Sequence, residues 1–469
     1  MKWEPVIGLE VHVHLRTRTK MFCRCELGYG DPENSRTCPV CLAHPGTLPV
    51  PNRTAVEMTI RLGLALGCEI APRALFHRKN YFYPDNPKGY QISQYDEPLC
   101  VNGTFVLPTE EGDAEIGIVR VHLEEDAAKT VHVGGGTGRK VGAEYSLVDF
   151  NRGGTPLVEI VTRPDLRSAE QAKRFLQLLR QTVVELGISD AEMEKGSLRW
   201  DANVSVREAG ETGYRTRTEL KNLNSFNFVA RGIEAEIARQ IGLYEAGSTV
   251  EQDTYDYDDA TGALTVHRSK EEADDYRYFP EPDLVPIEPP AALVERVRTE
   301  LPELPGERIK RLAPALEFET VVGLVTSGRA RLYERIALDG VDAKTASNVL
   351  MNEFVATGVD PAAVNAPELS KVIASRATIP RATFVRALEE SANPDFKAET
   401  YLAEALVAEA SELEPLIDDI LANNPAQVES YRGGKQGVLG FFVGQVMKET
   451  QGKADPKVVN QLLREKLSA

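Results

Sequence analysis

The chain of 469 residues has no uninterrupted run of 18 apolar residues and only six cysteines. Without such a run we expect no membrane span, and the alternating N-terminus lacks the continuous apolar stretch of a signal peptide. Six cysteines are too few for a disulfide scaffold in a chain of this length. We therefore expect a cytoplasmic protein in a reducing compartment, with about three domains at ~150 residues each.

Several catalytic motifs are also missing. The sequence has no Gly-x-x-x-x-Gly-Lys-Ser/Thr loop, so any use of a nucleotide is not of the P-loop type. It has no nucleophile elbow, no cysteine context typical of a glutaminase and no serine-rich glycine loop of an amidase. If the chain takes part in nitrogen-transfer chemistry, a partner must therefore supply the ammonia.

Basic residues are scarce relative to acidic ones. The chain has 54 Lys and Arg against 71 Asp and Glu, a net charge of −17, which taken whole argues against a nucleic-acid binder. Residues 430–469 differ, because they carry 7 basic and 3 acidic side chains, a balance of +4. Contact with a polyanion would therefore belong at the ends of the chain and in particular pockets.

The secondary-structure pattern changes along the chain. The first ~290 residues show strand and hairpin patterns, interrupted by one helix capped by Ser168 with Gln171 and another from Ser225 to about Leu243. A proline-rich stretch near 280–305 marks a boundary, because repeated loss of backbone donors prevents regular structure. Helical periodicity follows to the C-terminus. The pattern predicts an α+β fold: a large mixed or antiparallel sheet domain, then an all-α domain and a small helical tail domain.

Four of the six cysteines lie within nineteen residues, in two close pairs. These are Cys23, Cys25, Cys38 and Cys41. Thiolates at such spacing can close a tetrahedral Zn²⁺ site, although the first pair is C-x-C and not the usual C-x₂-C. We predict a structural zinc site; the alternative is four free thiols in a turn. Cys68 and Cys100 are expected to be ordinary buried thiols.

Four predicted strands carry acidic residues opposite their apolar face. Side chains two apart share a face, so Glu10, His12 and His14 lie together on one strand. Three other strands repeat this pattern, with Arg120, His122 and Glu124, with Arg199 and Asp201, and with Arg217, Glu219 and Lys221. The commoner explanation is a solvated outer face. The alternative is a cation site, for which oxygen ligands with an imidazole favour Mg²⁺ or Mn²⁺ without excluding Zn²⁺.

Together, several long motifs resemble the B-subunit family of the aspartyl/glutamyl-tRNA amidotransferases. The resemblance covers the whole chain, and the motifs occur in order. They are Gly8-Leu-Glu-Val-His12, the cysteine pairs, Arg78-Lys-Asn-Tyr-Phe-Tyr-Pro-Asp85, Lys88-Gly-Tyr-Gln-Ile-Ser-Gln-Tyr-Asp96, His122-Leu-Glu-Glu-Asp126, Asn151-Arg-Gly-Gly-Thr-Pro156, Leu220-Lys-Asn-Leu-Asn-Ser-Phe226 and Asp275-Tyr-Arg-Tyr-Phe-Pro-Glu-Pro-Asp283.

The resemblance implies a cradle domain (1–292), a helical domain (293–405) and a tRNA-binding tail domain (406–469). It also implies an activity: ATP activates glutamate on tRNA-Gln, or aspartate on tRNA-Asn, as an acyl phosphate, and ammonia then displaces the phosphate. A partner of the amidase type (the A subunit) would release the ammonia from glutamine, and a small third partner (the C subunit) would complete a heterotrimer. The sequence leaves open which mischarged tRNA is the substrate.

The resemblance also selects site residues from the polar faces. It implies catalytic roles for Glu10, His12 and Glu125, with Lys79 and Lys88 screening the phosphate charge or lining an ammonia channel. In the basic tail it implies tRNA contacts, for which the candidates are Lys435, Lys448 and Lys453. The implied Mg²⁺ ligands are Glu10, His12, Glu124, Glu125, Asp201 and Glu219.

Two other functions compete with this interpretation. One is a non-catalytic, zinc-containing scaffold that binds tRNA while its partners do the chemistry. The other is a stand-alone metal-dependent ligase for free amino acids, against which the basic C-terminus counts.

Overall fold

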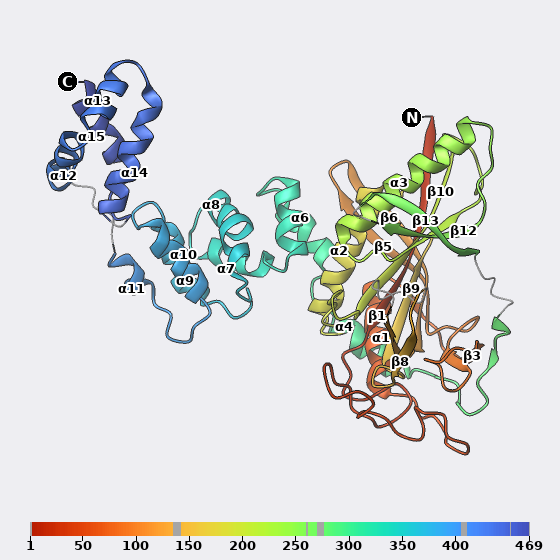
Figure 1. The fold of residues 1–469 in the computed structure, drawn as a ribbon. Helices are drawn as coiled ribbons and strands as arrows, with labels where there is room; N and C mark the ends of the chain where they lie inside the picture. The colour runs from red at the N-terminus through yellow and green to blue at the C-terminus, as the bar shows by residue number, and fades with distance from the viewer. Residues whose placement is uncertain are drawn as a thin grey trace. The chain divides into compact units, whose positions relative to one another are not determined.

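The computed structural model describes residues 2–134, 142–258, 261–269, 276–404, 410–450 and 452–468. The chain forms two compact units, Met1–Lys310 and Arg311–Ala469. The first contains the sheets and the second is helical, so the predicted α+β class is confirmed (Figure 1). The predicted boundary at 405/406 and Asp275 of the last motif lie outside the described residues. The division into three domains stays a prediction.

A nine-stranded mixed sheet forms the core of the first unit. Its strand order is β13-β12-β11-β10-β1-β9-β6-β5-β2. β1 lies near the middle and pairs antiparallel with β10 and β9, whereas β11 and β12 run parallel. The strands are β1 (Trp3–His14), β2 (Glu69–Ile70), β5 (Cys100–Thr109), β6 (Gly112–Glu125), β9 (Pro156–Thr162), β10 (Leu198–Glu208), β11 (Thr218–Lys221), β12 (Asp253–Asp258) and β13 (Ala263–Ser269).

Two smaller sheets accompany the large one. β14 (Phe279–Pro280), β3 (His77–Asn80) and β4 (Tyr90–Ser93) form a three-stranded antiparallel sheet. β7 (Lys129–Val133) and β8 (Tyr145–Asp149) form a separate two-stranded antiparallel sheet.

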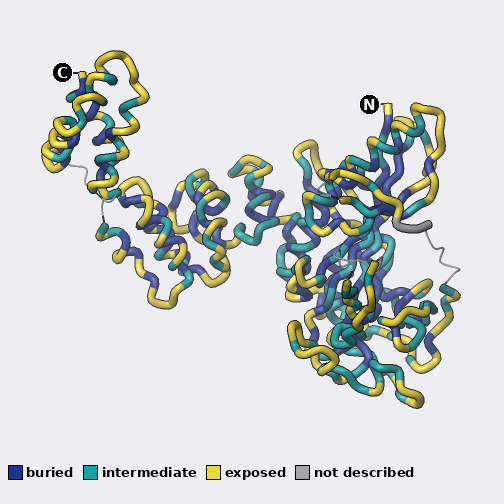
Figure 2. The backbone as a smooth tube through the Cα atoms, viewed as in Figure 1, coloured by how far each residue is buried: buried dark blue, intermediate teal, exposed yellow. Residues whose placement is uncertain are grey.

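Helices cover the apolar face of the large sheet. α2 (Ala169–Glu185) begins as predicted, because the Ser168 side chain accepts a hydrogen bond from the Gln171 backbone N–H. The side chains of Phe175, Leu179, Val183 and Leu186, spaced along one side of this segment, are buried. α3 (Phe226–Glu245) packs on β10, with Phe226 stacked on Trp200 at a centroid distance of 5.2 Å. The dark buried trace in Figure 2 follows the central strands beneath these helices.

A third helix, α1 (Arg53–Ala65), approaches the sheet closely at a glycine. A Cβ atom on Gly63 would lie 2.5 Å from Cys100 Sγ of β5, so only glycine permits this contact. Cys68 and Cys100 are buried free thiols, as predicted. α4 (Ala291–Thr299) also packs against α1.

The second unit consists of short helices. In its C-terminal part, the buried residues Leu413, Ile417, Phe442, Val446 and Leu463 form a common core. No helix within the described ranges is both long and apolar enough to span a membrane. After α5 (Pro305–Leu312), the helices are α6 (Phe318–Thr326), α7 (Ala330–Leu338), α8 (Ala343–Asn348), α9 (Ala366–Ala374), α10 (Arg381–Glu390), α11 (Ala398–Leu402), α12 (Ala410–Ala422), α13 (Pro425–Arg432), α14 (Leu439–Glu449) and α15 (Pro456–Ser468).

Candidate functional site

The strand register brings the predicted polar faces together. On β1, Glu10 lies opposite Asp201 of β10, and His12 lies opposite Glu159 of β9. Glu159 in turn lies opposite His122 of β6. Directly opposed residues of antiparallel strands project from the same face, so one polar surface crosses β10, β1, β9 and β6.

A histidine–carboxylate group, His12, Glu124 and Glu159, lies at the centre of this surface. Its three ligand atoms lie within 4.8 Å of one another, and it is one of two groups in the described part of the chain that could hold a metal ion. His12 Nε2 is 3.4 Å from Glu159 Oε2 and 3.6 Å from Glu124 Oε1. Ligands about 2.1 Å from a Mg²⁺ ion lie roughly 3.0–4.2 Å apart, so these donors fit such an ion.

The group is electrostatically strained without a cation. Burial, together with the charge of Glu159, raises the pKa of Glu124 to about 7. Burial would also raise the pKa of Glu159, but His122, His12 and Arg120 hold it well below its usual range. Burial alone would lower the pKa of His12, yet its contacts with Glu159 and Glu124 raise it to about 9. A divalent cation would relieve the repulsion between the two carboxylates.

His122 also borders this group, but its pKa shifts in the opposite direction to that of His12. Its Nε2 lies 3.6 Å from Glu159 Oε2, and burial lowers its pKa to about 4 in spite of that carboxylate. Lys79 is close enough for its charge to act on both His122 and Glu124, and its Nζ lies 4.6 Å from the ring centroid of Tyr276.

Three of the predicted Mg²⁺ ligands lie farther along the polar surface and surround a lysine. Lys221 Nζ is 2.5 Å from Asp201 Oδ2 and 3.5 Å from Glu219 Oε1. Burial would lower the pKa of Lys221, but the charges of Asp201, Glu219 and Glu10 raise it. Asn203 Nδ2 also donates to Glu10 Oε1 at 3.2 Å. The Lys221 ammonium therefore offsets part of the negative charge of these acids.

Glu125 points away from its neighbour Glu124, because successive strand side chains alternate. Its Oε1 accepts a hydrogen bond from the Ile92 backbone N–H at 3.0 Å and pairs with Lys88 Nζ at 2.5 Å. This pair lines a cavity of about 170 Å³ whose wall also includes Cys41 and His44. The six predicted Mg²⁺ ligands therefore lie in three places. His12 and Glu124 are in the histidine–carboxylate group, Glu125 pairs with Lys88, and the other three lie around Lys221.

Glu159 was not among the site residues predicted from the sequence. The segment Leu157–Thr162 is recognisable as a strand, and Glu159 is its one charged residue, between apolar Val158 and Ile160. A lone carboxylate within an apolar strand is a signal that could have marked it, because burial without a partner is costly.

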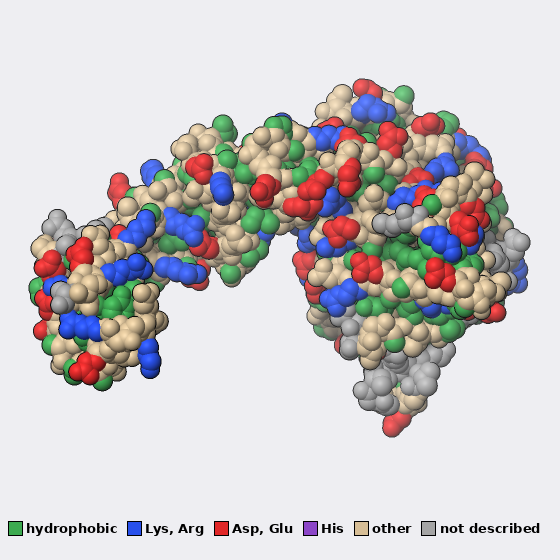
Figure 3. Space-filling model, turned by 90° about the horizontal axis from the view of Figure 1, so that it is seen from above, with side chains coloured by type: hydrophobic (Ala, Val, Ile, Leu, Met, Phe, Trp, Pro, Cys, Tyr) green, Lys and Arg blue, Asp and Glu red, His purple; other side chains and the backbone are tan. Residues whose placement is uncertain are grey.

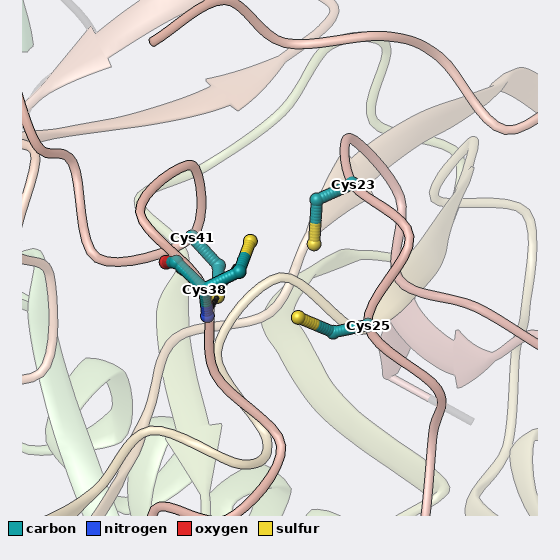
Figure 4. Close-up of side chains that lie close together, drawn as sticks. All are labelled: Cys23, Cys25, Cys38 and Cys41. Carbon is teal, nitrogen blue, oxygen red and sulfur yellow. Dashed lines mark hydrogen bonds between the residues drawn. The ribbon is translucent and has the colours of Figure 1, made fainter.

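The four clustered cysteines come together from two loops, as Figure 4 shows. Their sulfur atoms lie within 4.8 Å of one another, and Cys41 Sγ is 3.9 Å from Cys38 Sγ. A tetrahedron with Zn–S bonds of about 2.3 Å has edges of roughly 3.8 Å, so the four thiols fit this metal. Burial and the contacts with Cys38 and Cys41 raise the pKa of Cys25 to about 11, whereas a hydrogen bond from Cys23 lowers the pKa of Cys41 to about 4.

The three predicted tRNA-contacting lysines are exposed in the second unit. Lys448 lies in the last turn of α14, and Lys435 and Lys453 lie in the segments before and after that helix. On the face shown in Figure 3, Lys and Arg side chains gather over the helices of this unit.

The first unit is built on a central mixed sheet and carries two groups that could hold a metal ion. The second unit is helical. A family model described as GatB/GatE catalytic domain matches residues 5–295, and one described as GatB domain matches residues 331–467. The chain belongs to the GatB family.

Curated relatives match over the full chain, and each is named as the B subunit of an aspartyl/glutamyl-tRNA(Asn/Gln) amidotransferase. The relative from Moorella thermoacetica is 47% identical over 481 aligned positions, which cover 100% of both chains. The relative from Syntrophotalea carbinolica is 45% identical, covering 100% of this chain and 99% of the relative. That from Geobacter sulfurreducens is 47% identical and covers 100% of both.

Proposed function

We propose that this chain is the B subunit of a multi-subunit amidotransferase that uses ATP to amidate glutamate on tRNA-Gln, aspartate on tRNA-Asn, or both. The observation that carries the proposal is full-length similarity to relatives with this name, at 45–47% identity. The histidine–carboxylate group supplies a site for the activation step. These features do not favour an inert scaffold.

The reaction has two steps. A side-chain carboxylate oxygen of the amino acid esterified to tRNA attacks the γ-phosphorus of ATP. This step forms an acyl phosphate and releases ADP. Ammonia then attacks the acyl carbon, the C–O bond to phosphate breaks, and the amide forms with loss of inorganic phosphate and a proton. Both reactants of the first step are anionic, so the site must neutralise charge.

His12, Glu124 and Glu159 would hold the Mg²⁺ ion for that step. When bound, Mg²⁺ supplies charge neutralisation and orients the phosphate oxygens. Lys79 of β3 is close enough for its charge to act on Glu124 and His122, and its ammonium would screen the phosphates. Glu10, Asp201 and Glu219 lie on the same surface around Lys221 and would shape its outer part.

The second step needs a route for ammonia from a partner. The Lys88–Glu125 pair lines the cavity that also contains Cys41 and His44, and we assign this cavity to that route. An amidase partner, the A subunit of the complex, would release the ammonia from glutamine, and a small C subunit would complete the heterotrimer.

The remaining predicted residues would have supporting roles. The four-cysteine group would hold a structural Zn²⁺, since four protein ligands leave no open position for substrate. Lys435, Lys448 and Lys453 would contact the tRNA phosphates, because they are exposed and lie close together along the chain around α14.

The test measures γ-phosphate release by this chain assembled with its amidase partner. Mischarged tRNA, the same tRNA uncharged and free glutamate are compared, each with Mg²⁺ and then with EDTA. We expect release only with charged tRNA and metal. Release that ignores the esterified amino acid would overturn the activation step and leave the scaffold, whereas turnover of free glutamate would favour the stand-alone ligase.

A further inference from the structure

We propose that Lys20 is a positioning residue that compensates the charge of the four-cysteine metal site and fastens it to the loop Phe150–Gly154. The proposal rests on the metal site proposed above. Lys20 is only 1% exposed and is among the largest fully buried side chains in the described part of the chain. It belongs neither to the polar surface nor to the lysines assigned to phosphate or ammonia.

The Lys20 ammonium lies beside a sulfur atom and a carbonyl oxygen. Nζ donates to the Phe150 carbonyl oxygen at 2.9 Å and lies 3.7 Å from Cys41 Sγ. No ion pair joins it to an Asp or Glu in the described part of the chain. A buried ammonium needs a compensating negative charge. The cysteine sulfur is the contact that can provide it.

With its metal bound, the four-cysteine site would itself carry a negative charge. Four thiolates and one Zn²⁺ sum to a formal charge of −2, and a buried −2 group is unfavourable without nearby donors. One ammonium beside Cys41 reduces this charge to −1. Groups outside the ligand shell that donate to ligands tune a metal in this way.

The backbone and stem of Lys20 hold the ammonium in place. The Lys20 N–H donates to the Cys25 carbonyl oxygen at 2.9 Å, and the Met21 N–H donates to the Gly154 carbonyl oxygen at 2.7 Å. Gly154 has φ +84°, and a Cβ atom there would lie 3.4 Å from Lys20 Cδ. Lys20 therefore contacts both cysteine pairs and the glycine turn at the same time.

The glycine turn in turn contacts the end of β6. The Gly154 N–H donates to the Asp126 carbonyl oxygen at 2.8 Å, and the Asp126 N–H donates to the Thr155 carbonyl oxygen at 2.9 Å. Asp126 directly follows Glu124 and Glu125. Lys20 thus links the metal loop to the strand end that carries the candidate catalytic carboxylates, and both border the cavity lined by Lys88.

The experiment measures zinc affinity of the full chain by competition with a chromogenic chelator, and thiolate-to-metal charge transfer after Co²⁺ substitution. Lys20→Met removes charge and donor, Lys20→Gln removes the charge but keeps a donor, and Lys20→Arg keeps both. Lys173→Met, at a partly exposed lysine of α2 paired with Glu170, is the matched control. We expect Lys20→Met and Lys20→Gln to bind zinc 10- to 100-fold more weakly. Lys20→Arg should keep its zinc affinity within a few-fold, and Lys173→Met should match the unmodified chain.

The outcomes separate the two proposals. If the unmodified chain binds no zinc, the metal site itself fails. If it binds zinc and Lys20→Met or Lys20→Gln binds equally well, the role of Lys20 is overturned and the metal site stands. If both neutral variants fail to fold in excess zinc while Lys20→Arg folds, the positive charge is required, as proposed; failure of Lys20→Arg as well would show that shape and not charge matters.

Discussion

At the residue scale, Glu159 is the most informative position, because it contacts both His12 and His122. Glu159→Gln keeps the shape of the side chain but removes the charge that a cation would need. We expect acyl-phosphate formation on charged tRNA to fall by roughly 10²- to 10³-fold, the usual loss when one preorganised electrostatic contact to a transition state is removed. Single-turnover release of γ-phosphate measures this effect.

The matched control is Glu170→Gln, at an exposed carboxylate of α2. Its phosphate release should equal that of the unmodified protein. Normal release by Glu159→Gln, together with complete loss in Asp201→Asn, would move the metal to the acids around Lys221.

At the element scale, one buried ion pair fastens β14 to β3. Arg78 donates from Nε and Nη2 to the two oxygens of Glu281, both at 2.7 Å, and Glu281 is buried. Removing one partner of such a pair costs about 2–3 kcal/mol here, less than for a fully buried pair because water reaches part of Arg78. We expect Glu281→Gln to lower the free energy of unfolding of the first unit by this amount in denaturant titrations.

The segment before β14 carries Tyr278, which stacks on Tyr95 at a centroid distance of 4.3 Å. Because the Arg78–Glu281 ion pair joins β14 to β3, Glu281→Gln should also increase amide hydrogen exchange in both strands. Glu288→Gln, at an exposed carboxylate in the segment after β14, is the control and should leave stability unchanged. Equal stability of both variants would mean that Arg78 finds other partners at no cost.

At the scale of the whole molecule, the net charge is negative, but residues 430–469 carry 7 basic and 3 acidic side chains. The net charge of −17 coexists with three exposed lysines around α14. Replacing Lys435, Lys448 and Lys453 together by Gln should weaken tRNA binding and reduce the slope of log K against log salt by about 2–3, since each phosphate contact adds roughly 0.7–0.9. Fluorescence anisotropy with labelled tRNA at several salt concentrations measures it.

Gln substitutions at three lysines of the first unit that lie outside the polar surface, Lys129, Lys173 and Lys195, provide a matched change in net charge. They should leave the salt slope nearly unchanged. An equal loss in both triple variants would show that overall charge, and not the tail, governs tRNA binding.

Local patterns in the sequence predicted the elements and their faces. Alternation put Glu10, His12 and His14 on the polar side of β1, and Ser168 began α2 at the expected residue. The spacing of the cysteines also predicted their cluster, because pairs two or three residues apart can meet with short loops. All of these depend on neighbours along the chain, so they follow from the sequence itself.

Only the tertiary structure decided which polar side chains meet. β1 pairs with both β9 and β10, and this register placed Glu159 beside His12 and Lys221 among the acids of β10 and β11. Glu125 turned to Lys88 and not to Glu124. Register and strand order join segments far apart in sequence, and a shift of one residue would reverse every face. Periodicity within each strand is therefore readable from the chain alone, whereas the partners across strands are fixed by the packed sheet.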